Sequence, residues 1–105
     1  MKIAVIVPVY NGEKFLPEFL SCLKRQTMKC FEVFFVDDAS TDKTREILQR
    51  ETAKEHAYHY FRNESRKGAA YSRNRGIESS QSEYVLCLDA DDLIADDLIE
   101  QLSQA

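Results

Sequence analysis

The chain has 105 residues and a formal charge of −4, from 14 basic and 18 acidic residues. This length predicts one domain over residues 1–105. The mildly acidic balance argues against a nucleic-acid-binding module held by bulk positive charge. Three cysteines cannot form a full disulfide framework, and without CxxC spacing they show no zinc-binding pattern. We therefore expect a cytoplasmic protein with reduced cysteines, and we place Cys22 and Cys87 in the core.

The first half of the chain predicts two strands, each followed by a helix. The apolar run over residues 2–9 fits a strand better than a secretory signal, and we expect it to end at Pro8, which cannot donate to a ladder. After an Asn-Gly turn, a helix starting at Pro17 has one apolar face. A strand over residues 31–36 leads to a charged helix over residues 43–54. The candidates for capping that second helix are Ser40, Thr41 and Asp42.

The helix expected over residues 69–79 has a mixed inner face, after a weaker strand over residues 57–61. Its inward apolar residues are Ala69, Ala70 and Ile77. Arg73 falls on the same face, four residues after Ala69, and a polar group there needs a partner. It is either a buried arginine paired with an acid or a residue that binds a ligand, and both readings stay open.

The fourth strand, residues 84–88, is a continuous apolar run that predicts a strand buried on both faces. It leads directly into Asp89, Asp91 and Asp92. Asp89 and Asp91 are two residues apart and point to one side of an extended segment, which suits Mg²⁺ or Mn²⁺. The alternative is that Asp91 or Asp92 caps the last helix, expected from about Asp96. Its expected inward residues are Leu98, Ile99 and Leu102.

Strands that alternate with helices predict an α/β fold with a parallel sheet and right-handed crossovers. We expect a Rossmann-like strand order of 3-2-1-4 with helices on both faces. In that order the carboxyl ends of three neighbouring strands carry polar residues: Tyr10-Asn11, Asp37-Asp38 and Asp89-Asp91. Their convergence on one rim predicts a crevice for a nucleotide and a metal ion.

Four segments resemble the inverting, GT-A-type glycosyltransferases of family 2, in the order and spacing of that family. They are VIVPVYNGEKFL, FEVFFVDDASTDKT, RKGAAYSRNRGI and SEYVLCLDADD. The resemblance implies a Rossmann-like, nucleotide-sugar-binding half of a longer enzyme. It also implies that the isolated chain is a fragment with little turnover, because the family's general base follows the acidic motif in a segment that nothing here matches. No catalytic residue is therefore assigned.

The resemblance also implies roles by position. Pro8 and Tyr10 match the segment where the tyrosine lies against the base, with Asn11 beside them, and Asp38 matches the acid that hydrogen-bonds the base. Asp37 is expected to be its structural neighbour. The remaining matches are Lys67 and Gly68 near the base and diphosphate, Arg73 and Asn74 in the helix motif, Asp89 on the ribose or phosphate side, and Asp91 as metal ligand with Asp89. One departure is Ser72, where alanine is usual.

The implied donor is a nucleotide sugar, most commonly a uridine diphosphate sugar, used with Mn²⁺ or Mg²⁺. The implied acceptor is a saccharide or a lipid-linked carrier in the synthesis of cell-surface polysaccharide or lipopolysaccharide, with the full-length protein peripheral to the inner face of the membrane. A face left uncovered by truncation would favour self-association.

Three alternatives remain. A receiver-type signalling domain would carry its acid pair after the first strand, which here ends in Pro-Val-Tyr-Asn. A nucleotidyltransferase would have a glycine-rich basic loop at that place. A non-catalytic nucleotide-binding or interaction domain is the most serious rival, because it would keep the donor half and lose the chemistry.

Overall fold

The computed structural model describes residues 2–104, which form a parallel four-stranded sheet in the order β3-β2-β1-β4. This is the predicted order. The strands are β1 (Ile3–Val9), β2 (Phe31–Asp37), β3 (Tyr58–Arg62) and β4 (Tyr84–Cys87). The helices are α1 (Leu16–Lys24), α2 (Thr44–Lys54), α3 (Ala69–Ser79) and α4 (Leu98–Ser103). Within the described residues, no helix is long and apolar enough to cross a membrane.

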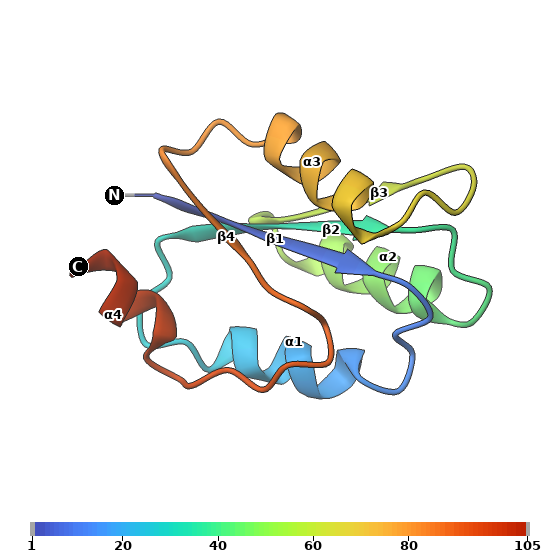
Figure 1. Ribbon diagram of the computed structural model, residues 1–105. Coiled ribbons are helices and arrows are strands. Elements are labelled where there is room, and N and C mark those ends of the chain that lie inside the picture. Colours follow the sequence, from blue (N-terminus) through green and yellow to red (C-terminus); the bar gives the residue numbers. More distant parts are fainter. Residues whose placement is uncertain (1, 105) are drawn as a thin grey trace.

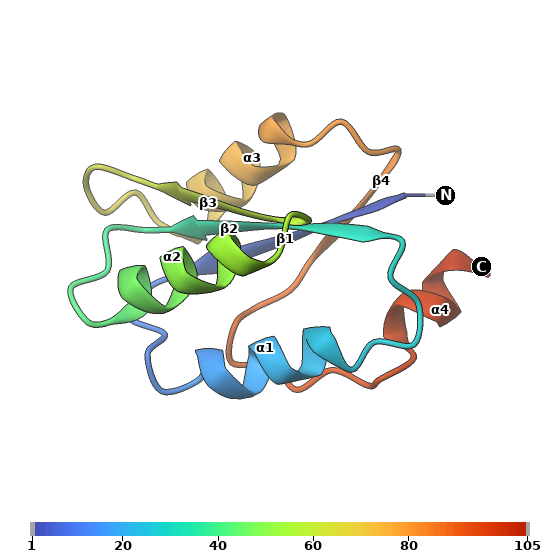
Figure 2. The same ribbon diagram turned by 180° about the vertical axis from the view of Figure 1, so that it is seen from behind.

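Alternation along the strands divides the core between two faces of the sheet, as the pleat requires. Figures 1 and 2 show α1 and α2 on one face and α3 on the other. The face toward α1 and α2 holds the larger cluster, which includes Val5, Val7, Phe19, Phe35 and Ile99. The opposite face holds a smaller cluster of Ala4, Ile6 and Phe34, with Phe61 packed against it.

Helix α3 lies against the sheet through small residues, and this corrects the predicted inner face. Ser72 and Gly76 are its buried residues, whereas Ala69, Ala70 and Ile77 are exposed. A Cβ atom on Gly76 would lie 2.5 Å from Cγ2 of Ile6, so the close approach of α3 to β1 requires glycine. The predicted face was wrong because it was assigned from apolar residues, whereas α3 contacts the sheet through the small residues Ser72 and Gly76.

Strand β4 is exposed, which corrects the prediction of a strand buried on both faces. It lies at the edge of the sheet, and Val85 and Cys87 pair with Ala4 and Ile6. They therefore project from the face that α3 covers, but α3 lies over β1 and β2. Cys87 is consequently exposed, whereas Cys22 is buried as expected, and all three cysteines are free. Self-association through this surface remains a prediction.

Several element boundaries differ from expectation. Strand β1 continues through Pro8 to Val9, and β2 includes Asp37. Helix α2 begins at Thr44, whose backbone N–H donates to Asp42 Oδ1 over 2.9 Å. Helix α4 begins at Leu98, so neither Asp91 nor Asp92 caps it. Of the three residues expected inward on that last helix, only Ile99 is buried.

Candidate functional site

The carboxyl ends of β1 and β2 are joined by a network of hydrogen bonds between the loops that follow them. The Asp38 N–H donates to the Val9 carbonyl over 2.8 Å. Asn11 has a φ of 49°, its N–H donates to Ser40 Oγ, and its side-chain oxygen accepts the Thr41 N–H over 2.8 Å. Asn11 therefore fixes the two loops together. Its expected contact with a nucleotide stays a prediction.

Asp37 is fully buried and forms its hydrogen bonds with groups inside the protein, as expected for the structural member of the acid pair. Its Oδ2 accepts hydrogen bonds from the Tyr60 hydroxyl over 2.7 Å and from the Arg62 guanidinium over 2.9 Å. Its Oδ1 accepts the Ser40 N–H. Burial is the main cause that raises the pKa of Tyr60 to about 12, followed by the hydrogen bond to Asp37. This cluster holds the end of β2 in place beneath the rim.

Asp38 faces the rim, and both of its carboxylate oxygens are hydrogen-bonded. Oδ1 accepts from the Lys67 N–H over 2.7 Å and from the Asn63 side chain over 2.9 Å. Oδ2 accepts from the Gly68 N–H over 2.9 Å and from Arg66 Nε over 3.2 Å. Burial by itself would raise the pKa of Asp38, but these hydrogen bonds outweigh it and lower that pKa. The group is therefore a fixed, ionised acceptor.

Asn63, which the sequence motifs did not single out, holds Asp38 from behind, and Ser72, noted only as a departure from alanine, holds Asn63. Asn63 is buried, and its amide donates to Asp38 and to Ser72 Oγ. Its oxygen accepts from Arg75 over 2.8 Å. The signal available in the sequence was position, because Asn63 directly follows a strand and Ser72 lies four residues after Gly68. Gly68 has a φ of 96°, a conformation that favours glycine.

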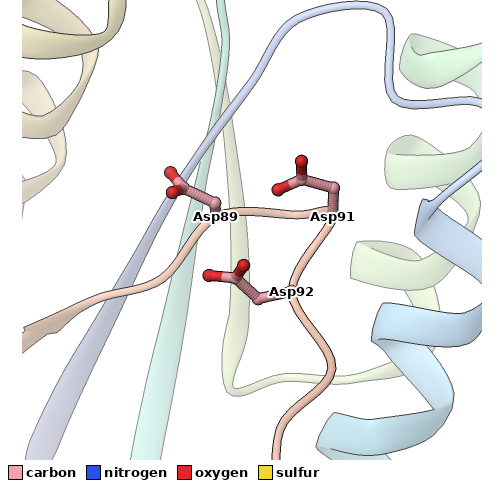
Figure 3. Close-up of side chains that lie close together, drawn as sticks. All are labelled: Asp89, Asp91 and Asp92. Atoms are coloured by element: carbon pink, nitrogen blue, oxygen red, sulfur yellow. The ribbon is translucent and has the colours of Figure 1, made fainter.

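The acidic motif forms the other side of the rim. Asp89, Asp91 and Asp92 lie on the loop after β4 (Figure 3), and each offers an oxygen within 4.8 Å of the others. All three side chains are exposed. Hard oxygen donors that lie this close together suit Mg²⁺ or Mn²⁺. The structure therefore brings together the two predicted ligands and adds Asp92 to them.

A pocket of about 300 Å³ lies beside the acidic motif, between the acidic loop and the end of β1 with the segment that follows it. Its lining includes Pro8, Tyr10, Phe15, Asp89 and Asp91. The Tyr10 and Phe15 side chains are exposed. The pocket therefore joins an aromatic surface to a group of carboxylates, as a ligand with a planar ring and a phosphate-bound cation would require.

The remaining predicted residues lie farther along the rim or on α3. Lys67 is exposed, with its ammonium 5.9 Å from the Tyr71 ring centroid. Arg73 is half-buried, and over residues 2–104 it has no ion pair or side-chain hydrogen bond. The reading of Arg73 as a buried arginine paired with an acid is therefore wrong, and ligand binding stays a prediction. Asn74 is exposed.

Comparisons with known proteins show the family of this chain. Residues 4–105 match the model of glycosyl transferase family 2. The putative teichuronic acid biosynthesis glycosyltransferase TuaG of Bacillus subtilis is 35% identical over 99 residues, which cover 94% of this chain and 39% of TuaG.

Two solved structures share the fold. Residues 1–349 of S. aureus TarS, in complex with UDP-GlcNAc, superpose with a TM-score of 0.91 at 34% identity, covering 99% of this chain and 30% of that one. The mannosyltransferase PcManGT of Pyrobaculum calidifontis, in complex with GDP-Man and Mn²⁺, gives 0.85 at 30% identity, covering 93% and 30%. This chain therefore spans about a third of the length of these relatives.

Proposed function

Because the chain belongs to glycosyl transferase family 2, we propose that its rim binds the nucleotide-sugar donor of a glycosyl transfer reaction. The observation that carries this proposal is the arrangement at the carboxyl ends of β1, β2 and β4. There Tyr10 and the carboxylates Asp89 and Asp91 border one pocket, and Asp92 lies close to these two carboxylates. The fixed carboxylate of Asp38 is joined to the Tyr10 ring through Arg66, which contacts both. The complexes of TarS with UDP-GlcNAc and of PcManGT with GDP-Man support it.

The base is proposed to lie against the Tyr10 ring and to donate a ring N–H to Asp38. Tyr10 is 43% exposed at the rim, where a planar ligand can reach it. Asp38 is ionised and accepts hydrogen bonds only, so it selects a base that presents a donor, such as uracil or guanine. Pro8 borders the same pocket, and the loop at Lys67 and Gly68 is close through its bonds to Asp38.

Asp89 and Asp91, with Asp92 as a third candidate, would hold the divalent cation. A bound cation would neutralise charge on the diphosphate leaving group. The carboxylates fit this role because they are exposed, close together and composed of hard oxygen donors. The remaining residues of the site position the donor, which lowers the entropic part of the barrier.

The complete reaction is proposed to be an inverting transfer to an acceptor hydroxyl in the synthesis of a cell-surface polysaccharide. The name of TuaG and the family resemblance support this acceptor class. An inverting transfer needs a base that deprotonates the acceptor. We propose that this base lies in the part of the longer enzymes that has no counterpart in these 105 residues.

Calorimetric titration with UDP, with and without Mn²⁺, tests the donor site. We expect binding that depends on Mn²⁺ and that is lost in Asp91→Ala. A matched control is Asp96→Ala, which removes an exposed carboxylate of the same loop that pairs with Arg25, and it should bind UDP as the unaltered chain does. A folded protein that binds no nucleotide at millimolar concentration would refute the proposal and favour a non-catalytic interaction domain.

A further inference from the structure

Arg66, on the loop between β3 and α3, contacts both groups to which the proposed function assigns the base. Its guanidinium carbon lies 3.4 Å from the centroid of the Tyr10 ring. Its Nε donates to Asp38 Oδ2 over 3.2 Å. The Arg66 side chain is 58% exposed, whereas the Asp38 side chain beneath it is only 4% exposed. The guanidinium therefore covers the carboxylate from the solvent side.

A ligand can reach Asp38 only by replacing one of its present donors. Each carboxylate oxygen already accepts two hydrogen bonds, and a carboxylate offers about four acceptor positions. Two of the donors are the backbone N–H groups of Lys67 and Gly68, and a third is the amide of buried Asn63. The fourth is Arg66, an exposed side chain that can leave without any change in the loop backbone.

The guanidinium has the chemistry of the ligand that the site is proposed to bind. It is planar, stacks on aromatic rings and presents N–H donors in its plane. A uracil or guanine ring also stacks on tyrosine and presents an N–H donor in its plane. We define the face of the Tyr10 ring together with Asp38 Oδ2 as the base seat. Arg66 fills the base seat in the same manner as such a ring would.

We propose that Arg66 occupies the base seat when no donor is bound, and that donor binding exchanges its guanidinium for the nucleobase. This inference rests on the proposed function. The base can stack and form its hydrogen bond only after Arg66 has given up its own contacts. The apparent affinity therefore equals the intrinsic affinity multiplied by the fraction of molecules in which the seat is empty. An exposed ion pair and a cation–π contact each have modest strength, so we expect a reduction of about three- to tenfold.

The test compares Arg66→Ala with the unaltered chain, using uridine and UDP as probes in NMR titrations. Uridine carries the base without phosphate, so the loss of a positive charge hardly affects its binding. We expect uridine to bind Arg66→Ala about three- to tenfold more tightly. Arg66→Met keeps a long side chain without the guanidinium, and it should change the affinity in the same direction. Arg45→Ala, which removes an exposed charge on α2, should leave the affinity unchanged.

A second measurement uses methylguanidinium as a soluble replacement for the lost side chain. It should compete with uridine for Arg66→Ala, whereas an equal concentration of methylammonium, which carries charge without the planar group, should not. Uridine binding that is equal or weaker in Arg66→Ala would overturn the inference and leave the proposed function intact. A failure of UDP and uridine to bind any of these proteins would overturn the proposed function and the inference together.

Discussion

The two sides of the rim hold their carboxylates in opposite states. On the side of β2, Asp38 is buried and both of its oxygens are hydrogen-bonded by the protein. On the side of β4, Asp89, Asp91 and Asp92 are exposed and lie close together. The first side is organised before any ligand arrives, whereas the second concentrates negative charge that a cation would neutralise. Hydrogen bonds within the protein thus position the carboxylate on the β2 side, whereas a bound cation would position the carboxylates on the β4 side.

The largest expected effect is a difference in stability between variants on the two sides of the rim. Asp38→Ala removes the acceptor of the buried Asn63 amide and of two partly buried backbone N–H groups. We expect a loss of about 3 kcal/mol in the free energy of unfolding. Asp91→Ala removes an exposed group and should change it by no more than about 0.5 kcal/mol. Urea unfolding followed by circular dichroism measures both, and similar losses in the two variants would contradict the comparison.

Addition of Mn²⁺ should stabilise the protein through the acidic side. At about one hundred times the dissociation constant, a ligand that binds only the folded state adds about 2.7 kcal/mol of stability. We expect a rise in Tm for the unaltered chain and none for Asp91→Ala, as thermal unfolding would show. The same rise in both proteins would place the cation elsewhere.

The pH dependence of stability should come from the buried side. The hydrogen bonds that outweigh burial lower the pKa of Asp38 below its ordinary 3.8, so its unfolded form binds a proton first as the pH falls. The stabilisation is therefore fully present above that ordinary value and is lost as the pH falls through the lower, folded pKa. Asp38→Asn should make the fall in stability between pH 5 and pH 2 (roughly the range for acidic groups) shallower. An unchanged profile in urea unfolding would show that other groups dominate.

The smallest expected effect tests the residues behind Asp38. Ser72→Ala removes a hydroxyl that accepts from Asn63 and donates to the Gly68 carbonyl over 3.0 Å. We expect a loss of about 1 kcal/mol in unfolding free energy and weaker UDP binding, because Asn63 then orients Asp38 less firmly. Ser79→Ala, an exposed position on the same helix, is the control. Unchanged UDP affinity in Ser72→Ala would show that Asn63 holds its position without the hydroxyl.

The sequence by itself determined the fold class, the strand order and the rim on which the polar clusters meet. These follow from local patterns, because apolar runs that alternate with amphipathic segments permit few arrangements other than a parallel sheet. The four motifs then indicated the family, which the match over residues 4–105 shows.

Only the tertiary structure decided which side chains are buried and which groups they contact. Strand β4 reads as a buried strand, yet at the edge of the sheet α3 does not cover it, so Cys87 is exposed. The roles of Asn63 and Arg66 depend on contacts with a carboxylate 25 and 28 residues earlier in the chain. The role of Ser72 depends on its hydrogen bond with Asn63. Local patterns record the period and polarity of a segment, whereas these contacts depend on how distant segments pack.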